Sequence, residues 1–174
     1  LASKGLYLKE GTVVDATIIA APPSTKNKSK SRDPQMRSTK KGNQYYFGMK
    51  AHIGADAASG LVHTLVTTAA NVHDVNQAHA LLHGEEQQVY GDSGYLGADK
   101  REENKDKDVE WVVAMRHGKR RKLRDSGTEE GQLADKIEKL KSRIRAKVEH
   151  PFYWVKVHFG HRKTRYRGLA KNTA

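Results

Sequence analysis

"GTVVDATIIAA", residues 11–21, is the stretch of sequence that decides the fold. Its β-branched residues predict a buried strand, which Pro22 and Pro23 end. A single acid, Asp15, interrupts the strand. Because an unpaired carboxylate is costly to bury, this side chain should be hydrogen-bonded, ion-paired or bound to a metal. A structural hydrogen bond and a metal ligand both stay open for Asp15.

The segments that follow alternate between strand and helix patterns. Residues 44–70 are expected to form a hairpin that turns at "GADAASG". A helix follows that Asp74 caps, with Gln77 at the capping-box position. After it come a strand that ends at Asp92, a strand over residues 109–115 and a helix that starts near Thr128. This order predicts an α/β fold with a mixed sheet.

The last helix carries one apolar stripe, and a basic connection precedes it. The stripe consists of Leu133, Ile137, Leu140, Ile144 and Val148. Pro151 is expected to kink this helix or to start a second one. The Gly-containing segment "RHGKRRKLRDSG" before the helix is expected to be a connection without regular structure.

The composition limits the class of protein. The chain has 174 residues, with 32 Lys and Arg against 20 Asp and Glu, a net charge of +12 and 36% hydrophobic residues. This indicates one domain and a polyanionic partner, most commonly nucleic acid, although a merely soluble basic protein is an alternative. The absence of cysteine excludes disulfides and thiolate zinc sites. No apolar run approaches the roughly 20 residues of a membrane span, so a cytoplasmic setting is expected.

Two further features concern the ends and the loops. The chain begins "LASKGLYLKE" without a methionine, which suggests that an N-terminal part is missing. Residues 24–42 contain seven Lys or Arg and one Asp. We therefore expect residues 24–43 to be a flexible loop, either solvated or lying on phosphates.

Asp92 and Glu149 each have an ordinary and a functional interpretation. Asp92 ends a strand before the small residues Ser93 and Gly94, so it is either an Asx-turn residue or a carboxylate presented for chemistry. Glu149 follows Arg145 by four residues, which is typical of a helix-surface ion pair. With Lys156 seven residues later, it would also suit a carboxylate that holds a metal beside phosphates.

The three acids together resemble a known family. "VVDATII", "YGDSGY" and an R-x3-E-x6-K pattern at Arg145, Glu149 and Lys156 resemble the DDE transposases of bacterial insertion sequences. The acids are 77 and 57 residues apart. The segments "TKKGNQYYFGMKAHIGADAASGLVHTLVTTAANVHD" and "RYRGLAKNTA" are similar to the same family, so the resemblance covers nearly the whole chain.

The resemblance implies a fold and its boundaries. It implies a ribonuclease-H-like catalytic domain over residues 1–174, incomplete at both ends. Asp15 would lie on the first strand, Asp92 at the end of the fourth, and Glu149 on the late helix. Members of the wider group often have Tyr where this chain has Ser142, which leaves an aromatic DNA contact at that position open.

The resemblance also implies the chemistry. Asp15, Asp92 and Glu149 would be catalytic and would bind two Mg²⁺ or Mn²⁺ ions. The enzyme would cleave double-stranded DNA at the element ends and transfer the freed strand into target DNA. It would act as a homodimer or larger assembly on DNA, in the cytoplasm at the nucleoid. DNA contacts are expected from Arg145, Lys156, Lys40, Lys41, Arg165 and Arg167.

Three alternatives remain. A hydrolytic nuclease of the same fold would have the same acids but would perform no strand transfer. A non-enzymatic DNA-binding module or an inactive fragment would use only the basic surface. A zinc site at His158 and His161 is the weakest, because His-x-x-His lacks a further well-spaced ligand.

Overall fold

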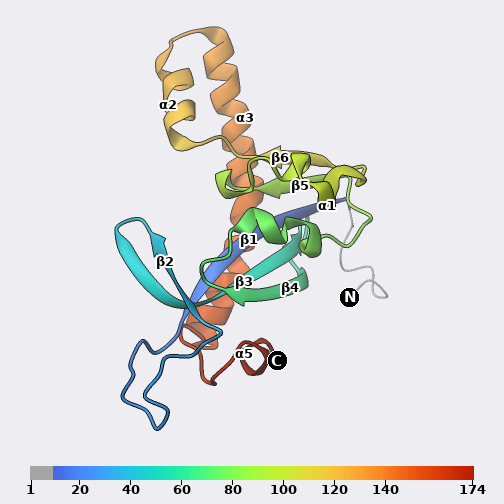
Figure 1. Cartoon of the computed structure of the whole chain (residues 1–174). Coiled ribbons are helices and arrows are strands. Elements are labelled where there is room, and N and C mark those ends of the chain that lie inside the picture. The colour runs from blue at the N-terminus through green and yellow to red at the C-terminus, as the bar shows by residue number, and fades with distance from the viewer. Residues whose placement is uncertain (1–9) are drawn as a thin grey trace.

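The computed structural model of the chain describes residues 10–174 (Figure 1). The expected start of the domain at residue 1, with its missing N-terminal part, lies outside these residues. The predicted first strand is confirmed as β1 (Gly11–Ala20). β1 pairs antiparallel with β3 (Gln44–Asp56) on one side and parallel with β5 (Gln88–Gly91) on the other. It therefore lies inside the sheet, as its apolar sequence predicts.

The sheet has six strands in the order β2-β3-β1-β5-β6, with β4 paired to β3. The remaining strands are β2 (Arg37–Lys41), β4 (Val62–Ala69) and β6 (Glu110–Val113). β3 and β4 form the predicted antiparallel hairpin, and β5 and β6 are parallel. The sheet is thus mixed, and with its flanking helices it confirms the predicted α/β, ribonuclease-H-like fold.

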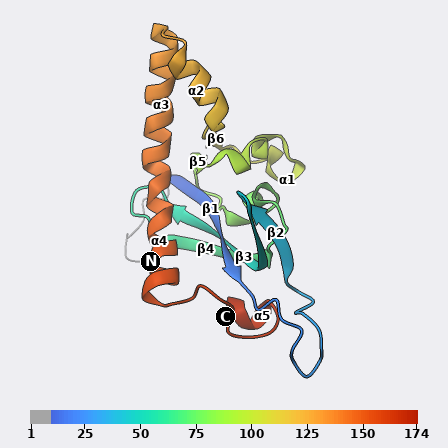
Figure 2. The ribbon, with the colours of Figure 1, turned by 90° about the vertical axis from the view of Figure 1, so that its left-hand side faces the viewer.

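Helices lie on both faces of this sheet, and the hairpin of α2 and α3 extends beyond it (Figures 1 and 2). They are η2 (Asp74–Leu81), η3 (Ser93–Tyr95), η4 (Ala98–Lys100), α1 (Glu102–Lys105), α2 (His117–Asp125), α3 (Glu129–Arg145), η5 (Ala146–Val148), α4 (Glu149–Tyr153), η6 (Trp154–His158) and α5 (Ala170–Thr173). Within residues 10–174, none of them is long and apolar enough to cross a membrane.

Alternate residues of β1 serve the two faces, because side chains along a strand point to opposite sides. Val13 packs with Val148 on the side of α3 and α4. Val14 packs with Leu81 and Tyr95 on the side of η2 and η3. Asp15 follows Val13 by two residues, so it shares the face on which the last helices lie.

The register of the parallel pair positions two of the predicted acids. Val13 lies opposite Tyr90 in the pairing of β1 with β5. Continuing that register by two residues would bring Asp92, which directly follows β5, beside Asp15, and the charge of Asp92 does act on Asp15. Asp92 follows the fifth strand of this chain rather than the fourth, because β2 adds a strand that the resemblance did not imply.

Two segments expected to be irregular are ordered. Residues 37–41 of the predicted 24–43 loop form β2, whose backbone pairs with the first part of β3 through a turn at Gly42, where φ is +60°. Part of the predicted basic connection forms α2. Lys, Arg and Leu are good helix formers, and Arg120 of α2 donates a hydrogen bond to Asp135 of α3 at 2.8 Å.

Two of the helix expectations need correction, and a third is confirmed. Asp74 does not cap η2, because its carboxylate contacts Lys50 instead. The expectation for Pro151 is confirmed, since a second α-helix, α4, starts at Glu149 after the turn η5 and has Pro151 in its first turn. The apolar stripe is present but only its end is buried: Leu133 and Leu140 are exposed, where the α2–α3 hairpin extends beyond the sheet (Figure 1).

Candidate active site

Asp15 is a nearly buried carboxylate with few partners. Its side chain is 19% exposed, and it accepts a hydrogen bond from the Ala16 backbone N–H at 2.7 Å. Burial raises its pKa to about 6, against the effect of that N–H, and Asp92 and Asp74 raise it further while Arg145 lowers it. The surroundings of Asp15 are therefore short of positive charge.

Arg145 connects Asp15 to the late helix. Its guanidinium lies 3.5 Å from Asp15 Oδ2 and 3.7 Å from Glu149 Oε1. The two acids are thus brought to either side of one cation, although 134 residues separate them. Glu149 is the more exposed partner, at 65% of its side chain, so its carboxylate can reach a molecule from outside.

Asp92 has the turn geometry that its sequence predicts. It precedes η3 and accepts a hydrogen bond from Gly94 N at 2.8 Å. This bond uses Oδ1 and fixes the carboxylate beside Asp15. The turn role is therefore confirmed, and it leaves Oδ2 available.

The structure adds a fourth acid that the sequence reasoning missed as a site residue. Asp74 Oδ1 lies 2.9 Å from Lys50 Nζ and 3.7 Å from His52 Nδ1. Burial and then Asp74, Asp15 and Asp92 raise the pKa of Tyr95 well above its usual value, so Asp74 lies near the other two aspartates. We call Asp15, Asp74, Asp92 and Glu149 the acid cluster. The "HD" that starts η2 was the available signal, but it was assigned to capping.

The carboxylates of the acid cluster do not converge on a single point. Asp15, Asp92 and Glu149 do not bring their ligand atoms within 4.8 Å of one another in the described part of the chain. Arg145 stands between two of them. The cluster therefore has the donors for cations but, in this arrangement, a guanidinium supplies part of the positive charge.

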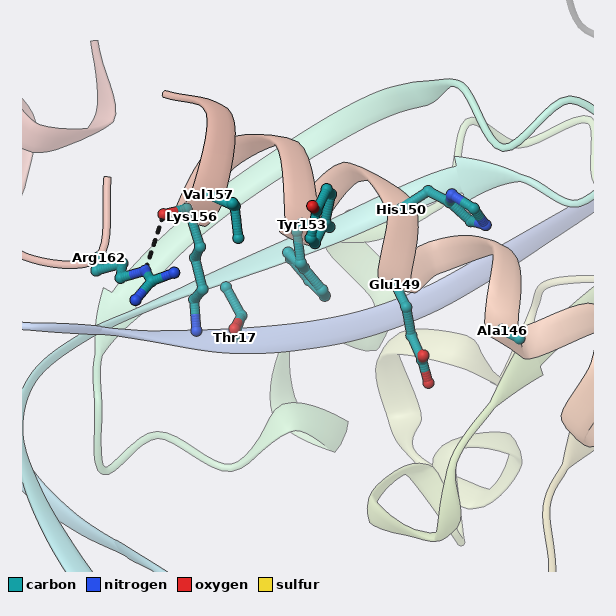
Figure 3. A pocket seen from close by; sticks show the side chains of 9 residues that line it. Thr17, Ala146, Glu149, His150, Tyr153, Lys156, Val157 and Arg162 are labelled. Atoms are coloured by element: carbon teal, nitrogen blue, oxygen red, sulfur yellow. Dashed lines mark hydrogen bonds between the residues drawn. The ribbon is translucent and has the colours of Figure 1, made fainter. Parts of the chain in front are cut away.

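A groove of about 750 Å³ runs from Glu149 along the last helices (Figure 3). Glu149 and Lys156 extend to the same side, toward β1 and Thr17. The Arg162 Nε donates to the Lys156 carbonyl at 3.1 Å. Burial lowers the pKa of Lys156, and the nearby Lys41 and Arg162 lower it further. The groove thus has an acidic end at Glu149 and a basic end at Lys156.

The other basic residues predicted to contact DNA lie on β2 and in the C-terminal segment, and Lys41 of β2 is near Lys156. Lys40 is on the exposed strand β2, 5.6 Å from the centre of the Tyr45 ring. Arg165 donates to the Phe159 carbonyl at 3.1 Å. Arg167 donates to Ser29 and Ser31, at 2.7 and 3.0 Å, and so holds the basic loop against the C-terminal segment.

A second polar group lies near the start of β1. His63, His83 and Glu86 have ligand atoms within 4.8 Å of one another, and we call them the histidine cluster. The buried Glu86 carboxylate accepts from the Thr12 hydroxyl at 3.1 Å and from His83 N and Gly84 N at 2.5 and 2.7 Å. Burial raises the pKa of Glu86, but the backbone N–H groups of the loop outweigh it and the pKa is lowered.

Hydrogen bonding assigns the protons of this cluster. Thr12 gives its proton to Glu86, so its oxygen, 3.2 Å from His63 Nε2, must accept from His63. His83 Nδ1 accepts from Glu85 N at 3.1 Å, which places the proton of a neutral ring on Nε2. A metal binds the lone pair of a neutral ring, so binding through Nε2 would require each ring to carry its proton on Nδ1. At His83 that change would break the hydrogen bond from Glu85 N, so the present hydrogen bonds favour the cluster without a metal.

His158 and His161 belong to no group of three metal-binding side chains in residues 10–174. His158 instead stacks on Trp154, with ring centres 4.1 Å apart. These contacts give the weak zinc interpretation no support.

Comparison with known protein families gives a match over nearly the whole chain. The family described as transposase DDE domain matches residues 7–174. No solved structure matches the chain.

Proposed function

The chain belongs to the transposase DDE domain family, and we propose that it cleaves DNA at the ends of an insertion element and joins them to target DNA. One observation carries this proposal: Asp15 and Glu149 converge on Arg145, beside Asp92 and at the edge of a groove. DDE transposases act on DNA by metal-dependent cleavage. Strand transfer, the site residues and the two ions are our proposals for this chain.

We propose Asp15, Asp92 and Glu149 as the ligands of two Mg²⁺ or Mn²⁺ ions. Carboxylate oxygens are the donors that these cations prefer. The raised pKa of Asp15 supports the assignment, since it reports burial and neighbouring carboxylates that a cation would offset. Bound there, such ions activate water and stabilise a leaving oxygen.

Contacts within the protein set the charge and the orientation of these carboxylates. Asp15 has to lose its proton before it can bind a cation, and Arg145 favours that loss. The Gly94 N–H orients the Asp92 carboxylate, and the pairing of β1 with β5 brings Asp92, just after the end of β5, near Asp15 on β1. Glu149 lies on a helix, where its exposed side chain can adjust to the DNA.

Glu149 and Lys156 of the R-x3-E-x6-K pattern line the groove, and Arg145 lies beside Glu149. We propose that Arg145 and Lys156 hold the phosphates on either side of the cleaved bond, Arg145 by two parallel hydrogen bonds and Lys156 as a point charge. The partly buried Lys156, with Lys41 and Arg162 nearby, makes that end of the groove suited to phosphate. Ser142 donates to the Glu138 carbonyl at 2.8 Å, so we assign it no DNA contact.

Two reactions would then follow in one site. Water oxygen bonds to phosphorus at the element end while the P–O3′ bond breaks, which leaves a free 3′-OH. That hydroxyl then bonds to a target phosphorus while the target's P–O3′ bond breaks. Neither reaction needs a covalent enzyme intermediate.

We further propose the partners and extent of the protein. Residues 1–174 form one catalytic domain that acts on double-stranded DNA at the nucleoid, as a homodimer or larger assembly. Lys41 would contact DNA at the basic end of the groove, and Lys40, Arg165 and the rest of the 24–43 segment would contact it outside the groove. Arg167 would position that segment through Ser29 and Ser31.

A strand-transfer assay tests the proposal against its alternatives. The substrate is the duplex end that flanks the coding sequence, pre-cleaved to a 3′-OH, with supercoiled plasmid as target and Mg²⁺ or Mn²⁺. Joined products would support the transposase. Plasmid nicking without joining would favour the hydrolytic nuclease, and DNA binding without either would favour a binding module.

A further inference from the structure

Asp74 is placed at the acid cluster by the loop that enters η2. Its Oδ2 lies 3.8 Å from the position that a Cβ on Gly94 would occupy, and Asp92 Oδ1 lies 2.9 Å from the same position. The two carboxylates therefore face one small space beside Gly94. A side chain at residue 94 would fill that space, and glycine leaves it accessible.

Lys50 holds one oxygen of Asp74 and leaves the other for a ligand. The Lys50 ammonium is 2.9 Å from Oδ1 and donates to the Val72 carbonyl at 2.7 Å, so it is fixed on two sides. No donor within residues 10–174 contacts Oδ2. The oxygen nearest Gly94 is thus an acceptor that is oriented but not satisfied by the protein.

A buried hydroxyl gives an independent sign of a ligand. Tyr95 is fully buried, and among the described residues its hydroxyl has no hydrogen-bond partner. Leaving a buried donor unsatisfied costs roughly 1–3 kcal/mol. Burial, and then the charges of Asp74, Asp15 and Asp92, raise the pKa of this hydroxyl and keep it protonated. It can donate to a water or carboxylate oxygen that also binds a cation.

A purely structural role for the Lys50–Asp74 ion pair would explain fewer of these observations than a cation site does. It accounts for Oδ1 but not for Oδ2 beside Asp92, nor for the unpaired Tyr95 hydroxyl. Only two cationic side chains, Arg145 and Lys50, contact the four acids of the cluster within the described residues. Divalent cations would offset the remaining negative charge.

We propose that Asp74 is a fourth carboxylate ligand of the divalent cations, shared with Asp92 and oriented by Lys50. This inference rests on the proposed function, because it extends the same cation site. Asp74 would bind through Oδ2, directly or through a water that Tyr95 also contacts. Lys50 is then a positioning residue.

Titration of the full chain with Mn²⁺, followed by calorimetry, tests the proposal. Asp74→Asn should lower Mn²⁺ affinity about 10–100-fold, in the range that loss of a supporting group at a metal site costs. Asp99→Asn removes the same charge from an exposed position and should bind as the unmodified chain does. Equal affinities for Asp74→Asn and the unmodified chain would overturn the proposal.

Asp92→Asn separates this inference from the proposed function. If Asp92→Asn weakens Mn²⁺ binding and Asp74→Asn does not, only the role of Asp74 is wrong. If neither variant changes binding, the proposed cation site itself fails, and with it the role of Asp74.

A measurement on the unmodified chain covers the case in which Asp74→Asn does not fold. Saturating Mg²⁺ should shift the carboxylate carbon resonance of Asp74 in ¹³C spectra while that of Asp99 stays in place. An Asp74 resonance that does not shift with Mg²⁺ would overturn the proposal.

Discussion

The acid cluster and the histidine cluster both lie along β1, and they differ in how their polar groups are satisfied. Each oxygen of Glu86 has a protein donor, and the loop's N–H groups lower its pKa. Asp15 has one backbone donor and a distant guanidinium, and burial raises its pKa to about 6. A buried carboxylate with protein partners stabilises the fold, whereas one without them is suited to a bound cation.

The largest effect that this comparison predicts is on catalysis. Asp92→Asn should lower metal-dependent cleavage of element-end DNA more than about 100-fold, since supporting groups alone cost roughly 10–100-fold. DNA binding should survive, because the basic residues are unchanged. Gel-based cleavage and binding assays measure the two, with Asp106→Asn as the exposed control. Cleavage at the unmodified rate would remove Asp92 from the site.

Asp15→Asn should stabilise the metal-free chain at pH 7–8. The native pKa of about 6 exceeds the ordinary 3.8, so the folded state binds more protons between these values and loses stability as the pH rises through them. At about 1.4 kcal/mol per pKa unit, removing the charge should increase the free energy of unfolding by on the order of 3 kcal/mol above pH 7. The difference in the free energy of unfolding between Asp15→Asn and the unmodified chain should shrink as the pH falls toward 4.

Urea unfolding at several pH values in a chelator measures this difference. Asp106→Asn serves again as control, and it should leave the free energy of unfolding nearly constant. A destabilised Asp15→Asn at pH 8 would show that Asp15 is instead a structural ion-pair partner of Arg145.

Glu86→Gln should have the opposite effect on stability. An amide NH2 would replace an oxygen that accepts from a backbone N–H, so we expect a loss of about 1–3 kcal/mol at pH 7. Because the pKa of Glu86 is lowered, the stability it contributes is present above its unfolded value of 4.5 and is lost as the pH falls through its folded value. The loss of stability of Glu86→Gln relative to the unmodified chain should therefore become smaller below pH 4.5.

Thermal unfolding of Glu86→Gln across this pH range, beside the exposed Glu102→Gln, checks the prediction. Unchanged stability at pH 7 would mean that the histidine cluster is not held by its hydrogen bonds. The contrast between a carboxylate that stabilises the fold, Glu86, and one suited to a bound cation, Asp15, would then fail.

The smallest effect concerns the basic end of the groove. Lys156→Ala should weaken DNA binding and reduce the slope of log affinity against log salt by about 1, the value for one phosphate contact. Fluorescence anisotropy at several salt concentrations gives this slope. Lys100→Ala, which removes an exposed lysine on η4, is the matched control. An unchanged slope for Lys156→Ala would exclude a phosphate contact there.

Local signals allowed much of the fold to be predicted. The β-branched run around Asp15 predicts β1, and the turn "GADAASG" predicts the hairpin of β3 and β4. Thr128 caps α3 by accepting from Gly131 N at 3.1 Å, where the helix was expected to start. Each of these signals lies within a few residues of the element it specifies.

The sequence could not reveal features that depend on distant contacts. β2 is ordered by pairing with β3, and α2 by its contact with Asp135, so their composition alone suggested loops. The same is true of Asp74, whose partner Lys50 lies 24 residues earlier on another strand. The three predicted acids came from the family resemblance together with their setting, and their metal-binding role stays a prediction.

Diffraction from crystals soaked in Mn²⁺, measured at the manganese absorption edge, tests the central claim most directly. The account predicts anomalous peaks between Asp15, Asp92 and Glu149, and none at His63, His83 and Glu86. An acid cluster without a peak, or a peak at the histidine cluster instead, would contradict it.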